Sequence, residues 1–220
     1  MVSLLAGSTV TVSSCQSAIA GAEARFKTAA AKLRVVGSDG RFVYATDDCG
    51  IRRIDPNTGA VTSLLPGGQF APATASVAIA GRYLYAVNNV NGGLAKIDLG
   101  SGPATVINSS VTGAVAADDA NVWIITGTTL LKINPANGQA TTISSQVPTN
   151  GYAPTAAISA GSYLYVDVRT SGTSNYTKTI RVAKSNGAGV TLTPNFGNVA
   201  GFASDNTRLF VADGGLKTVA

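Results

Sequence analysis

One unit of about 40 residues occurs five times along the chain, and this repeat strongly limits how the chain can fold. The copies share a tight polar turn, an apolar strand and a strand in which, in the first four copies, a basic residue precedes Ile or Val; a further strand follows in those four copies. The first two copies occupy 40–45, 50–56 and 60–65, and then 82–86, 93–98 and 104–107. A period of this length with four short strands per unit predicts an all-β fold, a β-propeller.

Aligning the copies gives columns of large side chains. The second-strand column is Tyr44, Tyr85, Ile124, Tyr165 and Phe210, and the residues before it are Val43, Leu84, Trp123, Leu164 and Leu209. The third-strand column is Ile54, Ile97, Ile133, Val182 and Val219, with a basic residue before it in the first four copies. Each blade of a propeller packs against a neighbouring blade on both faces. Its inner strands are therefore apolar on both sides, which fits the lack of strict alternation between apolar and polar residues in this chain.

The repeat predicts a single propeller domain over 1–220 with about five four-stranded blades. Their bounds are approximately 33–66, 75–108, 113–145, 155–195 and 198–220, and 8–32 is a loop insertion. Residues 1–7 resemble the fourth strand of the first copy, so we expect them to complete the last blade and close the ring. A second chain can supply the same strand through the same hydrogen bonds, which predicts self-association by strand exchange as the alternative.

Composition narrows the classes of partner. Apolar residues make up 45% of the 220 and charged residues 12%, a balance that suits a packed core. The formal charge of +5 comes from dispersed basic residues, which disfavours nucleic acid as a partner. No apolar stretch reaches the length of a membrane span. Low charge with many small polar residues is typical of secreted or cell-surface proteins, and the export signal would then lie outside this sequence.

The first copy resembles NHL repeats in its Leu5-Ala6-Gly7-Ser8 turn, its Asp39-Gly40 turn and its strand 51–55. Later copies are similar to the looser extracellular propellers of YVTN type, which have Asp-Pro-x-Thr-Gly turns. The resemblance implies a platform that binds protein, glycan or RNA, or a lyase or lactone hydrolase. Familiar NHL rings have six blades, so five blades with one split depart from that pattern.

Polar residues follow the second strands and form a candidate rim. Asp47 and Asp213 occupy equivalent positions with Asn88, while Gly127 and Val168 interrupt the column, and Asp48 and Asn89 adjoin it. Carboxylate and amide oxygens suit Ca²⁺, so a calcium site is one interpretation. The other is that these side chains cap turns through nearby backbone amides.

Two further groups lie on the predicted long connections. Tyr152, Tyr176 and Arg169 are suited to contacts with a protein or carbohydrate partner, although they can equally fold back over the blades. Cys15 and Cys49 are predicted to form a disulfide that holds the insertion, which implies an oxidising compartment. Two unrelated buried thiols are the alternative.

The residues favour a non-catalytic extracellular module with no cofactor beyond a candidate Ca²⁺. We expect it to contact a protein or glycan through the face of the propeller that carries the long connections. The chain has no histidine, and it carries no phosphate loop, nucleophile elbow or zinc spacing. The first alternative is a calcium-dependent hydrolase or lyase like the lactonase and streptogramin-lyase propellers, and streptogramin lyases depend on histidine. The second alternative is an RNA-binding NHL-like propeller.

Overall fold

The computed structural model describes residues 34–47, 50–66, 76–88, 92–100, 104–169, 177–192, 201–204, 209–212 and 216–219. All regular structure in these ranges is β-strand, and it forms consecutive antiparallel sheets. Contacts divide the chain into two units, Met1–Ala75 and Ser76–Ala220, each of which is described by itself.

The first unit holds one four-stranded meander, whose strands are β1 (Arg34–Ser38), β2 (Val43–Asp47), β3 (Gly50–Ile54) and β4 (Val61–Pro66). Its turn at 39–42 is organised by Asp39. The Asp39 carboxylate accepts hydrogen bonds from the backbone N–H groups of Arg41 (2.9 Å) and Phe42 (2.7 Å), and from the Tyr44 hydroxyl (2.7 Å). Burial, together with the hydrogen bond to Asp39, raises the pKa of Tyr44.

The second unit holds three four-stranded meanders and one three-stranded sheet. Blade 2 comprises β5 (Ser76–Ala80), β6 (Tyr83–Val87), β7 (Leu94–Asp98) and β8 (Ala104–Asn108). Blade 3 comprises β9 (Ala114–Ala117), β10 (Val122–Thr126), β11 (Thr129–Ile133) and β12 (Ala140–Ser144). Blade 4 comprises β13 (Ala153–Ala160), β14 (Tyr163–Arg169), β15 (Thr177–Ala183) and β16 (Gly189–Thr191). The last sheet comprises β17 (Gly201–Ser204), β18 (Leu209–Ala212) and β19 (Leu216–Val219).

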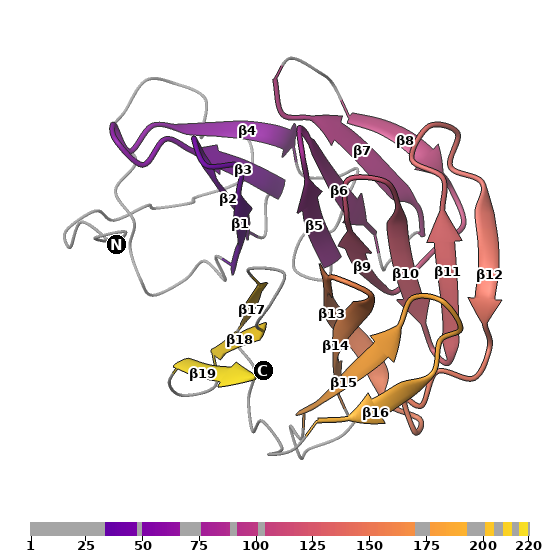
Figure 1. The fold of residues 1–220 in the computed structure, drawn as a ribbon. Coiled ribbons are helices and arrows are strands. Elements are labelled where there is room, and N and C mark those ends of the chain that lie inside the picture. Colours follow the sequence, from indigo (N-terminus) through magenta and orange to yellow (C-terminus); the bar gives the residue numbers. More distant parts are fainter. Residues whose placement is uncertain are drawn as a thin grey trace. The chain divides into compact units, whose positions relative to one another are not determined.

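The first strand of each sheet in this unit contacts the first strand of the next. β5 contacts β9, β9 contacts β13, and β13 contacts β17 (Figure 1). β13 also contacts β5, two sheets away, so the first strands gather together. This arrangement of repeated four-stranded meanders is that of a β-propeller. The predicted closing strand, residues 1–7, lies outside the described residues, and the single-domain prediction therefore remains a prediction.

The core lies between the blades. Trp123, Ile125 and Leu130 of blade 3 pack against an apolar cluster of blade 4, which is Leu164, Val166, Val168, Ile180 and Val182. Ile124 and Val122, on the opposite face of blade 3, pack against Tyr85, Val87 and Leu94 of blade 2. The second strands are therefore buried on both faces, whereas the fourth strands β8 and β12 contain no fully buried residue.

The sheet register corrects one predicted column. In each blade one residue of the second strand pairs with the third-strand Ile or Val, and in blade 3 this residue is Val122, which pairs with Ile133. The aromatic column is therefore Tyr44, Tyr85, Trp123, Tyr165 and Phe210, without the predicted Ile124. The same shift also changes the column of candidate rim residues that contains Asp47 and Asn88. In blade 3 the equivalent residue is Thr126 and not the predicted Gly127. Blade 3 misled the alignment because Val122, Trp123 and Ile124 are all large and apolar.

A basic residue pairs directly across from the column aromatic in four blades. The pairs are Tyr44 with Arg53, Tyr85 with Lys96, Trp123 with Lys132, and Tyr165 with Arg181. These cations lie near the turn that joins the first and second strands. The corrected register thus reveals a repeated aromatic–cation pair that the sequence alignment had displaced in blade 3.

Candidate functional site

The two ends of the second unit carry different connections. We call the end with the turns between first and second, and third and fourth, strands the tight-turn face. The other end, with the second-to-third and blade-to-blade connections, is the long-loop face. Antiparallel pairing within each meander fixes which connections share an end.

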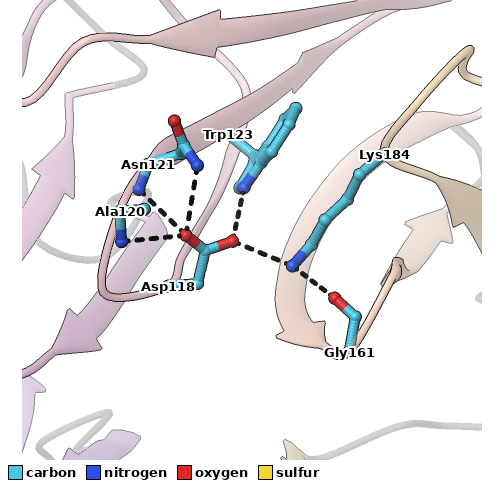
Figure 2. Close-up of polar contacts among 6 residues, drawn as sticks. All are labelled: Asp118, Ala120, Asn121, Trp123, Gly161 and Lys184. Carbon is cyan, nitrogen blue, oxygen red and sulfur yellow. Dashed lines mark hydrogen bonds and ion pairs between the residues drawn. The ribbon is translucent and has the colours of Figure 1, made fainter.

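On the tight-turn face a polar clamp joins blades 3 and 4 (Figure 2). Asp118 Oδ1 accepts hydrogen bonds from the backbone N–H groups of Ala120 (3.1 Å) and Asn121 (2.9 Å). Its Oδ2 accepts hydrogen bonds from Trp123 Nε1 (2.9 Å) and from Lys184 Nζ (2.8 Å). Lys184 Nζ also donates to the Gly161 carbonyl oxygen at 2.7 Å. One carboxylate thus organises its own turn and bridges two blades.

The clamp requires Asp118 to be ionised. Burial opposes ionisation, but the hydrogen bonds from Lys184 and Trp123 outweigh it and lower the pKa of Asp118 to about 2. The hydrogen-bond donors to the Asp118 carboxylate named above are all protein groups. The Lys184 ammonium group already donates to two oxygen atoms, Asp118 Oδ2 and the Gly161 carbonyl oxygen. The clamp is therefore a structural element, and we place no ligand on it.

A second polar cluster lies near the long-loop end of blade 4. Asp167 in β14 is only 1% exposed, and its Oδ2 accepts hydrogen bonds from Thr155 Oγ1 (3.0 Å) and Arg169 Nε (3.3 Å). Arg169, a candidate from the sequence, ends strand β14 and is half-buried against this carboxylate. A buried carboxylate needs such partners, so the cluster anchors Arg169 beside the start of β13.

A hollow of about 440 Å³ opens on the long-loop face between blades 3 and 4. We call it the threonine groove, after its lining of Thr112, Thr126, Thr128, Thr149, Gly113, Gly127, Gly151, Tyr152, Ala153 and Pro154. Tyr152 is half-buried against the core, and Lys178 Nζ lies 4.9 Å from the centre of its ring. The lining contains hydroxyls, backbone and apolar carbons but no charged side chain.

The structure places part of the predicted site. Tyr152 lines the threonine groove, and Arg169 pairs in register with Ala153, which also lines it. Asn88 is 2% exposed, and its backbone N–H donates to the Gly93 carbonyl oxygen at 2.9 Å. Asp47 ends strand β2, but its side chain is not described. Asp48, Asn89, Tyr176, Asp213, Cys15 and Cys49 lie outside the described residues.

The rim and disulfide predictions are accordingly untested. Among the residues that the structure describes, no group of three or more His, Cys, Asp or Glu side chains is placed to hold a metal ion. The aspartates on which the calcium interpretation depends are not among the described side chains. Within the same ranges no helix has the length and apolar character that a membrane crossing needs.

Sequence reasoning missed Asp118, Asp167 and the threonine groove. Asp118 had a usable signal, because Asp39 and Asp118 each stand five residues before an aromatic residue that donates to them. Asp167 interrupts the apolar strand Tyr163–Arg169, which also signals a specific buried partner. The groove has no comparable signal, since its threonines come from three separate connections.

The fold and the comparisons agree on the class of protein, a β-propeller. The matching family model covers residues 13–201, and the chain belongs to the family described as "Domain of unknown function (DUF5074)". That family carries no specific NHL assignment, so the NHL relationship remains a prediction. No curated protein matches the chain.

Solved structures resemble the chain in fold. A chain of a nidogen/laminin complex is 14% identical with a TM-score of 0.59, and the match covers 81% of this chain and 73% of that one. A putative TolB from Agrobacterium tumefaciens is 9% identical with a TM-score of 0.60, over 81% and 68% of the two chains. The extracellular domain of a putative one-component system from B. thetaiotaomicron is 18% identical with a TM-score of 0.52, over 84% and 26%.

Proposed function

We propose that this chain is a non-catalytic binding propeller that works outside the cell and recognises a neutral glycan in the threonine groove. The observation that carries the proposal is the lining of the groove by four threonine residues and Tyr152, without a charged side chain. The extracellular assignment is supported by the low charge of the chain and by its structural similarity to the extracellular domain of a putative one-component system.

Hydroxyl groups suit a sugar because each one both donates and accepts hydrogen bonds, as sugar hydroxyls do. Tyr152 adds a phenol hydroxyl with the same two capacities to the lining. The cluster around Asp167 and Arg169 keeps the start of β13 in place beside Tyr152. A small hollow on a rigid scaffold is the usual form of such a site.

The test is a glycan array probed with the intact chain, followed by calorimetric titration of any glycan that binds. We expect Tyr152→Phe and Thr128→Val each to weaken binding by about 5- to 10-fold, since each removes one hydrogen bond from the groove. Thr105→Val, an exposed position on the outer strand β8, is the matched control and should bind normally. A defined protein ligand that binds equally well to the groove variants would instead assign binding elsewhere and contradict the glycan proposal.

A further inference from the structure

A second hollow, of about 560 Å³, lies on blade 3 at the tight-turn face, away from the threonine groove. We call it the Lys132 hollow. Its lining comes from the two turns and the third and fourth strands of this blade, namely Ala120, Asn121, Lys132, Asn134, Pro135, Gln139, Thr141 and Ile143. The neighbouring clamp fixes Asn121 in place through Asp118 (Figure 2).

The hollow lies where other blades carry an aromatic ring. In each blade one second-strand residue pairs with the third-strand Ile or Val. The residue just before it is aromatic in the β1–β4 sheet, which we call blade 1, and in blades 2 and 4: it is Phe42, Tyr83 and Tyr163, respectively. In each, the third-strand cation covers this ring: Arg53 over Phe42 (4.7 Å), Lys96 over Tyr83 (4.0 Å) and Arg181 over Tyr163 (4.7 Å). Blade 3 has Asn121 at this position, so Lys132 lacks the ring that its three counterparts cover.

Lys132 is also available to an anion. Its ammonium group lies 5.7 Å from the centre of the Trp123 ring, and none of the described carboxylates pairs with it. The Asn134 Oδ1 atom is occupied by the backbone N–H of Ala136 at 2.9 Å, which leaves the Asn134 amide group as a donor. The hollow thus presents the half-buried ammonium group of Lys132 and the amide donor of Asn134, a combination that favours a carboxylate.

We propose that the Lys132 hollow binds a small aromatic carboxylate, whose ring takes the place of the missing blade aromatic and whose carboxylate pairs with Lys132. The ring is argued from the three equivalent blades, and the carboxylate from the Lys132 ammonium group and the Asn134 amide. This site is independent of the glycan site, because it uses the opposite face and shares no residue with it.

The test uses benzoate as the probe, with benzamide lacking the charge and cyclohexanecarboxylate lacking the aromatic ring. Trp123 is the only tryptophan of the chain, so its emission reports on the hollow directly, and calorimetry supplies a second readout. We expect benzoate to bind with a Kd on the order of 1 mM, as suits a ligand of this size. Benzamide and cyclohexanecarboxylate should each bind at least about 10-fold more weakly.

Variants then locate the site. Asn121→Tyr should restore the ring found in the other blades and abolish benzoate binding, and Lys132→Met should weaken it at least about 10-fold. Arg181→Met, the equivalent change in a blade that has its own ring, should leave binding unchanged, and melting temperatures confirm that each variant is folded. The proposal is overturned if benzoate fails to bind, if cyclohexanecarboxylate binds as well, or if the folded Asn121→Tyr and Lys132→Met variants both bind benzoate normally.

Discussion

At the scale of single residues, two turns depend on the same arrangement of an aspartate and an aromatic side chain. Asp39 and Asp118 each cap the backbone of a four-residue turn, and each accepts a hydrogen bond from the aromatic residue five positions later. In blade 3 the same carboxylate also holds Lys184 of the neighbouring blade. The aspartate therefore links turn formation to the packing of one blade against the next.

The first prediction concerns the pH dependence of this clamp. The pKa of Asp118 is lowered from 3.8 to about 2, so its contribution to the free energy of unfolding is fully present above pH 4 and is lost as pH falls towards 2. We expect Asp118→Asn to destabilise the chain by about 2 kcal/mol at pH 7, and by much less at pH 2. Chemical denaturation at several pH values measures this difference. An equal loss at pH 7 and pH 2 would contradict the role given to the carboxylate.

A second prediction concerns glycine in equivalent turns of two blades. Gly138 and Gly59 have the same φ of 71°, but a Cβ at Gly138 would lie 1.6 Å from the Ile107 carbonyl oxygen, whereas at Gly59 it meets nothing within 4 Å. Since no described residue lies within reach of a Cβ at Gly59, we expect Gly59→Ala to cost about 1 kcal/mol through backbone strain. Gly138→Ala should cost more than about 3 kcal/mol, because blades 2 and 3 must separate locally.

Denaturant titration of both variants separates strain from collision. Similar losses at the two positions would show that the close approach of Gly138 to blade 2 does not contribute to stability.

The side chain of Asn108 forms a polar contact at the same boundary between blades 2 and 3, since its Nδ2 donates to the Gly138 carbonyl oxygen at 3.0 Å. Asn108 also begins a glycosylation sequon, and we expect this hydrogen bond to keep the side chain unmodified.

At the scale of strands, burial declines from the second strand of a blade to the fourth. β10 is buried along nearly its whole length, whereas β12 is exposed over its first three residues. Local opening should therefore be easiest at the outer strands. We expect amide hydrogen exchange to be slowest in β6, β10 and β14 and fastest in β8 and β12, as measured by mass spectrometry of peptides from each strand. Uniform protection across each blade would contradict this ordering.

The strands were also the part of the fold that the sequence predicted best. Runs such as Tyr83–Val87 and Val122–Thr126 are apolar, aromatic and β-branched, and the turns beside them contain Gly, Asp and Asn. The exact register in blade 3 was not predictable, because three consecutive large residues fit the column equally well. Only the pairing of Val122 with Ile133 resolves that choice.

At the scale of the whole molecule, the site was less predictable than the fold. Tyr152 was a candidate from the sequence because an aromatic residue in a long connection has no evident role in a blade, and its role in binding stays a prediction. The threonines of the groove and the hollow beside Lys132 depend on residues brought together from separate turns, and threonine and asparagine are ordinary turn residues. The absence of an aromatic residue at position 121 is recognised only when the corrected register aligns Asn121 with Phe42, Tyr83 and Tyr163 of the other blades.

Closure of the propeller gives a prediction at this scale. We expect residues 1–7 to supply the fourth strand beside β19, since the described part of the last sheet has three strands. A chain that lacks residues 1–7 should then oligomerise or melt at a lower temperature, because an unpaired strand edge is exposed. Light scattering and thermal melts measure both effects. An unchanged monomer with an unchanged melting temperature would show that these residues do not close the sheet.

The central claim is that the threonine groove makes this propeller a glycan-binding module. Its most direct test is calorimetric titration of a neutral glycan selected on the array, with the intact chain and Tyr152→Phe compared side by side. We expect saturable binding by the intact chain and binding about 5- to 10-fold weaker by the variant, with the Thr105→Val control unchanged. Identical affinities for the intact chain and the folded Tyr152→Phe and Thr128→Val variants, or no glycan binding at all, would contradict it.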